Sequence, residues 1–271
     1  MWTGIAARIT AWPMTFSIRS LHWLFALLAA SLLAACGDPA ARGPVVLAPA
    51  SMQEALSEVA KAWAAQGNAM PLLSFAGTQA QARQLAQGAP ADVIITADEE
   101  WMDWLETRAL IEPPSRRTVA ANGLALVSGT AFGPDDTTTS RLLTLDDGRL
   151  ALADPQSVPA GRYTRVALEN MGLWDAVAAQ VVPAENVRAA LALVESGEAA
   201  LGIVYRTDAE ASSRVESKAF DFRDVPEIFY PAALVAGASH PRRQAFVDFM
   251  TTPVAQEIFA AHLFVPVEQA P

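Results

Sequence analysis

The stretch VVLAPASMQEALSEVAKAWAAQG at residues 45–67 decides the fold. Its first four residues are apolar and predict a buried strand. Over residues 51–65, apolar side chains such as Leu56 and Trp63 recur at close to the helical period, and Gly67 is a typical helix end. A strand followed at once by an amphipathic helix is the repeating unit of α/β domains.

The same unit recurs along the chain, interrupted by a loop rich in Asp and Thr at residues 133–140. We therefore expect an α/β fold with mostly parallel strands, built as two α/β units. The expected strands are 45–48, 72–75, 92–96, 122–128, 150–153, 181–182, 202–205 and 228–236, and the expected helices are 51–65, 78–87, 99–107, 162–171, 187–196 and 242–259.

Two of these helices are expected to begin at a hydroxyl side chain. Ser51 opens the first, and Thr78 follows Gly77, which permits a close approach of the backbone. Because N–H groups at a helix start carry partial positive charge, either position could bind an anion. Both also fit a simpler interpretation, since Ser51 with Glu54 and Thr78 with Gln81 have the spacing of a capping box.

Two further helix starts carry no bulky charged side chain at the first turn. The sequence VPAGRY at 158–163 places Pro and Gly ahead of one helix, and PAENV at 183–187 opens another near Val187. One such junction is expected in any α/β protein, whereas four, together with Tyr205 at a strand end, favour a shared anion site. Several converging helix starts could hold a dianion without Lys or Arg.

The balance of charge is acidic, with 19 Lys and Arg against 29 Asp and Glu and a net charge of −10. This argues against a nucleic-acid partner and against electrostatic binding to a membrane surface. The field of the whole protein would not attract an anion, so local dipoles would have to do so.

An apolar run, LFALLAASLLAA at residues 24–35, predicts a signal peptide over residues 1–35, because it ends in small residues and is too short for a comfortable membrane span. It leads into Cys36, the single cysteine, in the pattern of a lipidated first residue; a stray buried thiol is the alternative. Met14 is an alternative start to Met1. The leader contains two basic residues, so its removal takes the net charge from −10 to −12. Because Cys36 is the single cysteine, the mature chain cannot form an internal disulfide.

An enzyme is the alternative from another functional class. The mature chain has only His240 and His262, and no base stands at a recognisable spacing from Ser51. Asp92 and Asp98 could act as acid and base, but Asp98 is more simply the cap of the helix near residue 99. We therefore predict binding without catalysis.

With these residues in view, the chain resembles the molybdate-binding proteins of bacterial ABC importers, which belong to the two-lobed periplasmic binding proteins. The resemblance spans nearly all of the mature chain and is carried by APASMQEAL (48–56), GAPADVIITADEEWMDWL (88–105), LADPQSVPAGRYTRVAL (152–168), AENVRAALALVESGEAALGIVYRTDA (184–209) and YPAALV (230–235). It implies high-affinity binding of molybdate or tungstate on the periplasmic side of the cell envelope, delivery to a membrane permease, no cofactor, and a lipid-anchored monomer.

The resemblance also implies the ligand contacts. Molybdenum would be held only as molybdate, by Ser51 and Thr78 through hydroxyl and backbone N–H, by Ala160 and Val187 through backbone N–H, and by Tyr205 through its phenol. Two departures stand out, because the family usually has Ser at position 78 and a run of alanines around Pro49. The extra methyl of Thr78 would tighten or tilt the pocket.

The five contacts would select the ligand by its protonation. All five donate hydrogen bonds, so hydrogen phosphate would leave its own proton unpaired at a cost of about 1–3 kcal/mol. Sulfate has shorter bonds to oxygen than molybdate, and tungstate is nearly the same size. A sulfate receptor, a tungstate receptor, or a lipoprotein that has lost its ligand are the alternatives; ferric iron is disfavoured, because Tyr163, Tyr205 and Tyr230 are not adjacent.

The resemblance implies a type II periplasmic binding protein fold, with two α/β lobes joined by two crossing strands and the ligand in the cleft. Residues 36–43 would be a tether, residues 44–122 and 228–271 lobe I, and residues 123–227 lobe II. Hinge closure would bring Ser51 and Thr78 on one lobe to the other three residues.

Overall fold

The computed structural model of the protein describes residues 42–221 and 223–267. The expected signal peptide, Cys36 and the tether up to residue 41 lie outside these residues. Within the described ranges, no helix combines the length and apolar character needed to cross a membrane.

The first of two five-stranded sheets has the strand order β2-β1-β3-β10-β4. Strands β1 and β2 and strands β1 and β3 pair in parallel, whereas β10 runs antiparallel to both β3 and β4. The strands are β1 (Val45–Pro49), β2 (Leu72–Ala76), β3 (Val93–Ile95), β4 (Arg117–Asn122) and β10 (Ile228–Leu234).

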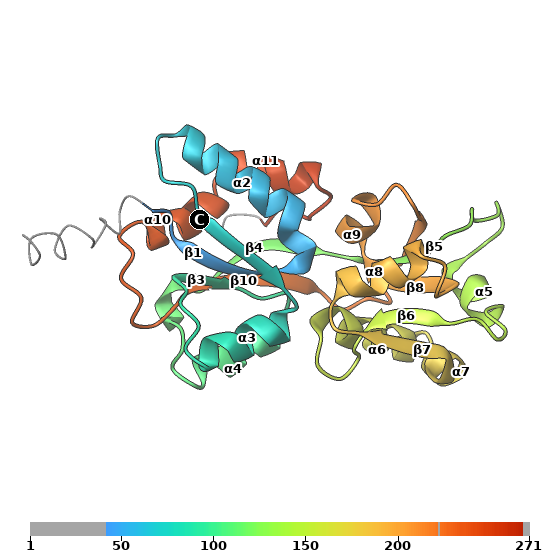
Figure 1. Ribbon diagram of the computed structural model, residues 1–271. Helices are drawn as coiled ribbons and strands as arrows, with labels where there is room; N and C mark the ends of the chain where they lie inside the picture. The colour runs from blue at the N-terminus through green and yellow to red at the C-terminus, as the bar shows by residue number, and fades with distance from the viewer. Residues whose placement is uncertain (1–41, 222, 268–271) are drawn as a thin grey trace, which may run out of the picture. The chain divides into compact units, whose positions relative to one another are not determined.

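Helices cover both faces of this sheet (Figure 1). Helix α2 packs with α10 and α11 on one face, and α3 packs with α4 on the other. On the first face Trp63 lies against Phe246, with ring centroids 5.6 Å apart. The helices are η2 (Ala50–Met52), α2 (Gln53–Ala65), α3 (Thr78–Ala86), α4 (Glu99–Glu106), η3 (Pro113–Ser115), α10 (Arg243–Met250) and α11 (Pro253–Ala261).

The second sheet repeats the arrangement with the order β7-β6-β8-β5-β9, and here β5 is the antiparallel strand. Its strands are β5 (Leu124–Ser128), β6 (Leu150–Ala153), β7 (Val181–Ala184), β8 (Leu201–Tyr205) and β9 (Glu216–Ala219). The helices are α5 (Thr138–Leu143), α6 (Pro159–Asn170), α7 (Trp174–Val177), η4 (Ala178–Gln180), α8 (Val187–Glu195) and α9 (Arg206–Glu210). Helices α6 and α8 lie on opposite faces, because their right-handed crossovers run in opposite directions across the sheet.

The chain passes between the two sheets twice, from β4 to β5 and from β9 to β10 (Figure 1). The antiparallel strand of each sheet is the first strand after a crossing. The prediction of two α/β lobes joined by two crossing strands is confirmed.

Several predicted elements were wrong in detail. The expected strand 122–128 is the end of β4 and all of β5, separated by Gly123. Helix α6 begins at Pro159, three residues earlier than expected, because a proline fits the first turn of a helix. For the same reason Pro253 begins a new helix and divides the expected helix 242–259 into α10 and α11. Strand β9 and helices α5, α7 and α9 were not predicted.

The start of α6 lies directly against the end of β6. A Cβ atom at Gly161 would stand 2.1 Å from the carbonyl oxygen of Ala153 and 2.5 Å from that of Asp154. Both obstacles are backbone atoms, so they cannot rotate away as a side chain could. Glycine at this position therefore fixes how closely α6 approaches the sheet.

We expect Gly161→Ala to lower the free energy of unfolding by about 1–3 kcal/mol, as overpacked substitutions do. Gly129→Ala is the matched control, because a Cβ there meets only the Val194 carbonyl oxygen, at 3.6 Å. Urea unfolding of both variants measures the difference. Equal midpoints for the two variants would contradict the close approach.

Candidate functional site

A small cavity of about 20 Å³ lies between the two lobes. It is lined by Pro49, Ala50, Ser51, Ala76, Gly77, Thr78, Ala97, Val158, Pro159, Ala160, Asn186, Val187 and Tyr205. All five residues predicted as ligand contacts are among them. None of the lining residues carries a charged side chain, and the lining segments all follow strand ends.

Ser51 lies in a short 3-10 turn rather than at the start of an α-helix. The turn η2 begins at Ala50, and α2 begins at Gln53 without a side-chain cap. The predicted capping box of Ser51 with Glu54 is therefore wrong. The Ser51 hydroxyl instead lies 3.0 Å from the phenol oxygen of Tyr230, and Ser51 is buried.

Thr78 is the first residue of α3, and Gly77 occupies the cap position. The predicted capping box with Gln81 is also wrong, because the Gln81 amide donates to the Ser74 carbonyl at 3.0 Å. Thr78 Oγ1 accepts a hydrogen bond from the Ala97 N–H at 3.1 Å. Since a backbone N–H can only donate, the Thr78 hydroxyl keeps its own hydrogen to donate into the cavity.

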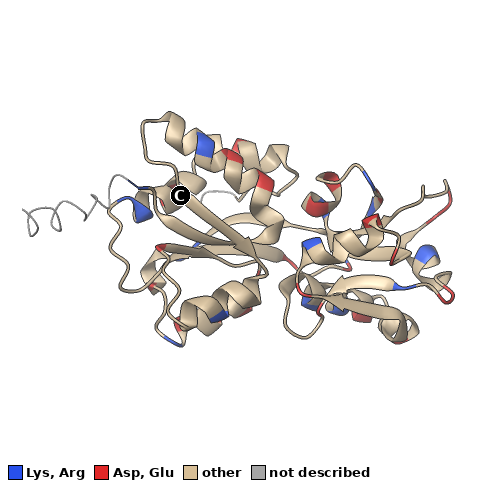
Figure 2. Ribbon diagram, in the orientation of Figure 1, with Lys and Arg blue, Asp and Glu red and all other residues tan. Residues whose placement is uncertain are grey.

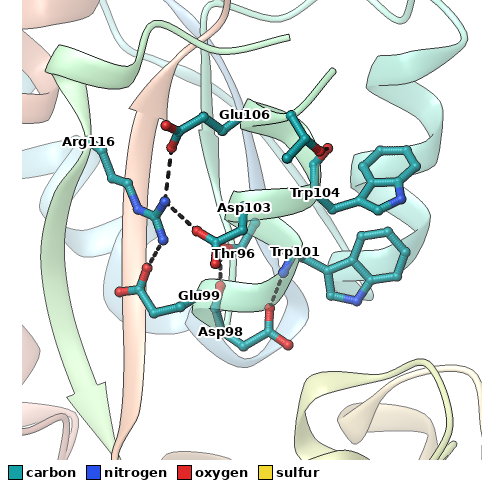
Figure 3. A network of polar contacts seen from close by, with 9 residues as sticks. Thr96, Asp98, Glu99, Trp101, Asp103, Trp104, Glu106 and Arg116 are labelled. Carbon is teal, nitrogen blue, oxygen red and sulfur yellow. Dashed lines mark hydrogen bonds and ion pairs between the residues drawn. The ribbon is translucent and has the colours of Figure 1, made fainter. Parts of the chain in front are cut away.

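The turn that contains Ala97 is held by hydrogen bonds of its neighbours Thr96 and Asp98, which Figure 3 shows. Thr96 Oγ1 donates to the Asp98 carbonyl oxygen at 2.6 Å. Asp98 Oδ1 accepts from the Trp101 N–H at 2.9 Å and caps α4, which confirms the interpretation of Asp98 as a helix cap. One end of the cavity is thus fixed by the start of α4.

Helix α4 is in turn held in place by Arg116, the residue directly before β4. Arg116 binds three carboxylates on that helix, those of Glu99, Asp103 and Glu106 (Figure 3). Asp92, which together with Asp98 was considered as an acid–base pair, accepts from the Val45 N–H at 2.8 Å. Neither aspartate lines the cavity.

Ala160 and Val187 face the cavity from the first turns of α6 and α8. N–H groups in a first helical turn have no carbonyl one turn earlier in the helix to bind. The side chain of Asn186 caps α8 by accepting from the Ala189 N–H at 2.9 Å, which leaves the Val187 N–H to the cavity. The two helices therefore present donors from the second lobe.

Tyr205 ends β8 and is 2% exposed, and its hydroxyl has no hydrogen-bond partner among the described residues. Burial raises the pKa of this phenol well above its ordinary value, so the group stays protonated and able to donate. A buried hydroxyl without a partner costs about 1–3 kcal/mol. An acceptor in the cavity would recover that cost.

The lobes contact one another around the cavity through residues that the sequence pattern did not single out. Gln79 donates to the Glu185 carbonyl at 2.7 Å, and Trp101 Nε1 donates to the Ser157 carbonyl at 3.0 Å. A Cβ at Gly77 would stand 2.9 Å from the Glu185 carbonyl oxygen. No periodic signal marks these contacts, because each joins residues far apart in the chain.

Two arginines bridge the lobes, and both are neutralised by carboxylates. Arg162 pairs with Asp98 and Glu100 across the cleft. Arg188 pairs with Glu54 of the first lobe at 2.5 Å and with Asp208 of its own lobe. Charged side chains lie mainly on helices and loops (Figure 2), and none of them lines the cavity.

Asp208 is fully buried beside Arg188. Burial raises its pKa to about 6, and the neighbouring Arg188 guanidinium opposes that rise. The carboxylate is therefore charged near neutral pH only because the arginine compensates it. This makes Arg188 a support for the helix start that carries Val187.

The lining of the cavity consists of hydrogen-bond donors and apolar groups. Thr78 accepts one hydrogen bond and has its own hydrogen to donate, Ala160 and Val187 offer backbone N–H groups, and the Tyr205 hydroxyl has no partner among the described residues. Within residues 42–221 and 223–267, no group of three or more His, Cys, Asp or Glu could hold a metal ion. The cavity suits a small anion that accepts hydrogen bonds from all sides.

The chain is similar to proteins of known binding function. A family model described as bacterial extracellular solute-binding protein matches residues 44–265. The molybdate-binding protein ModA of Escherichia coli is 39% identical over 247 residues, covering 89% of this chain and 96% of that protein. The putative ABC transporter substrate-binding lipoprotein YvgL of Bacillus subtilis is 30% identical, covering 81% and 85%. The solved periplasmic molybdate-binding protein of Azotobacter vinelandii has a TM-score of 0.76 at 26% identity, covering 83% of this chain and 100% of that one.

The chain therefore belongs to the bacterial extracellular solute-binding proteins, a family of transport proteins rather than of enzymes. Within that family, the similarity places it among the molybdate-binding proteins of the ModA type.

We expect Arg188→Met to destabilise the protein by about 3–5 kcal/mol near pH 7.5, because it leaves the buried Asp208 carboxylate uncompensated. The folded-state pKa of Asp208 already lies above 3.8, so protonation favours the folded state, and stability falls as pH rises through about 6. Without Arg188 that pKa rises further. The loss should therefore be smaller near pH 5, as measured by urea unfolding at both pH values.

Arg165→Met is the control, since it also removes one positive charge but breaks a half-exposed pair with Glu169 and a contact of the guanidinium over the Trp174 ring, and leaves no buried charge uncompensated. Its effect should be within about 1 kcal/mol at both pH values. A loss in Arg188→Met no larger than in this control would show that Asp208 does not depend on Arg188.

Proposed function

We propose that this protein binds molybdate, and tungstate with it, on the outer side of the cytoplasmic membrane and delivers it as a monomer to the permease of an ABC importer. The observation that carries the proposal is the convergence of donors on one cavity. Ser51, Thr78, Ala160, Val187 and Tyr205 all line it, and no charged side chain does.

The donor set favours a fully deprotonated tetrahedral dianion. The Thr78 hydroxyl accepts from the Ala97 N–H, and the ligand is the acceptor available to its own hydrogen among the groups at the cavity. Hydrogen phosphate would bring a proton for which no carboxylate lines the cavity, at a cost of about 1–3 kcal/mol. Helix starts supply the compensating positive potential, although the chain carries a net charge of −10.

Sulfate is the second candidate ligand, because it too is a deprotonated dianion. Its shorter bonds to oxygen would leave its hydrogen bonds long in a cavity shaped for molybdate. The similarity to molybdate-binding relatives across 89% of the chain favours molybdate. The Thr78 methyl, absent from a serine, further narrows the pocket on the first lobe.

The closed arrangement supports a hinge mechanism. In this proposal residues 44–122 and 228–271 move as lobe I and residues 123–227 as lobe II, with the bends at the two crossings between sheets. Contacts such as Arg188 with Glu54 and Gln79 with Glu185 would form only on closure. The permease would then recognise the closed form.

We expect Ser51→Ala and Tyr205→Phe each to weaken molybdate binding by about 1–3 kcal/mol, since each removes one donor to a charged acceptor. Isothermal titration of the protein without residues 1–36, against molybdate, tungstate, sulfate and phosphate, measures this. Ser57→Ala is the control, because Ser57 is a partly exposed residue of α2 that does not line the cavity and donates to the Gln53 carbonyl. Sulfate binding as tight as molybdate binding would contradict the selectivity, and absence of all binding would contradict the function.

The sequence around Cys36 supports a lipid anchor as part of the same proposal. The Bacillus subtilis relative carries the name of a lipoprotein, and LAAC ends the apolar leader of this chain. Lipidation would keep the binding protein beside its permease without a membrane-spanning helix.

We expect Cys36→Ser to move the full-length protein from the membrane fraction to the soluble fraction, because it removes the acceptor of the lipid. Metabolic labelling with a palmitate analogue, followed by fractionation, measures this. Molybdate affinity should stay unchanged, since the proposed contacts are made by Ser51, Thr78, Ala160, Val187 and Tyr205. Equal labelling of wild type and Cys36→Ser would rule the anchor out.

A further inference from the structure

A chain of polar side chains, partly buried at Asn122 and buried at Tyr230 and Ser51, connects a crossing between the lobes to the cavity. It runs from Asn122, the last residue of β4, through Tyr230 on β10 to Ser51. Asn122 Nδ2 lies 3.2 Å from the Tyr230 hydroxyl, which lies 3.0 Å from Ser51 Oγ. Neither Asn122 nor Tyr230 lines the cavity. The direction of each hydrogen bond in this chain follows from the orientation of the Asn122 amide.

The first bond fixes the orientation of the Asn122 amide. The Gly123 N–H donates to Asn122 Oδ1 at 2.9 Å, and a backbone N–H can only donate. The amide oxygen must therefore face Gly123. The amide nitrogen then faces Thr207 Oγ1, at 3.0 Å, and the Tyr230 hydroxyl.

The second bond fixes the hydrogen of Tyr230. An amide nitrogen can only donate, so the Tyr230 oxygen accepts from Asn122. Tyr230 is 0% exposed, and burial raises the pKa of its phenol, so the hydroxyl keeps its hydrogen. Among the described residues, the remaining partner of this hydroxyl is Ser51 Oγ, which must accept that hydrogen.

Ser51 connects these hydrogen bonds to the cavity. Because Ser51 Oγ accepts from Tyr230, its own hydrogen is left to point at whatever occupies the space that Ser51 lines. Thr78 is polarised in the same sense by the Ala97 N–H. Among the described residues neither hydroxyl has another acceptor for its own hydrogen, so both favour donation into the cavity, although each keeps a second lone pair.

We propose that Asn122 and Tyr230 are positioning residues that hold the Ser51 hydroxyl as a donor and so exclude protonated oxyanions from the site. This inference rests on the proposed function and names the residues that set its selectivity. A serine hydroxyl free to rotate could turn a lone pair toward the ligand and accept the proton of a hydrogen phosphate or hydrogen arsenate. The relay from Asn122 removes that freedom.

The experiment compares molybdate with hydrogen arsenate, a tetrahedral dianion that keeps one proton near pH 8 and is larger than hydrogen phosphate. Isothermal titration gives the ratio of the two affinities for the wild type and each variant. The ratio is the informative quantity, because a general loosening of the site or an added charge weakens both dianions together.

In Tyr230→Phe the ring still packs against Phe264 and Tyr205, but Ser51 loses its donor. We expect molybdate affinity to fall about tenfold and the preference for molybdate over arsenate to fall about tenfold. In Asn122→Asp, a carboxylate oxygen would accept the Tyr230 hydrogen and reverse the relay, so that Ser51 presents a lone pair. The preference should fall further in that variant, about 30-fold or more.

Tyr163→Phe is the control, since it removes a phenol hydroxyl that neither lines the cavity nor bonds Ser51, and it should keep the wild-type ratio. Thermal unfolding verifies that each variant is folded, and Asn122→Asp serves if Tyr230→Phe is not. A wild-type ratio in a folded Tyr230→Phe or Asn122→Asp variant overturns the relay alone. A wild-type protein that binds no oxyanion overturns the proposed function and the relay with it.

Discussion

The convergence of strand ends on one gap is the constraint on which the site depends. Every segment that lines the cavity follows a parallel strand of one sheet or the other, and most of these segments begin a helix. Backbone N–H groups at a helix start cannot be satisfied within the helix, so the four helix starts among these junctions, those of η2, α3, α6 and α8, concentrate donors where the two sheets meet. Antiparallel insertion of β5 and β10 allows the chain to build both sheets while crossing between them only twice.

The pairing of charged side chains near the cavity explains how an acidic protein can hold a dianion. The arginines nearest the cavity, Arg162 and Arg188, are each matched by two carboxylates. They therefore hold the lobes and the helix starts in place rather than attract the ligand. What remains to face the ligand is a set of fixed dipoles, which need no reorganisation when the ion enters. This arrangement leaves Asp208 buried, and the Arg188 guanidinium compensates the charge of its carboxylate.

Sequence pattern predicted the two α/β units and the helix starts that meet in the cavity, because both follow from local signals, whereas the family resemblance supplied the individual contact residues. Strands alternate with amphipathic helices, and small or hydroxyl residues stand at the helix starts. The capping boxes failed because the chain enters α2 through a 3-10 turn and α3 through Gly77, which shifts Ser51 and Thr78 away from the cap positions. The relay through Tyr230 and the pairing of Arg188 with Glu54 were not predicted, since they join residues 179 and 134 positions apart.

The position of Gly77 carries a consequence for the size of ion that fits. A Cβ there would stand 2.7 Å from Gln79 Oε1 and 2.9 Å from the Glu185 carbonyl oxygen of the second lobe. The lobes therefore approach one another here through the Gly77 backbone and the Gln79 side chain, which donates to the same carbonyl at 2.7 Å. A larger residue at position 77 would hold the two lobes further apart and so widen the space that an ion must fill.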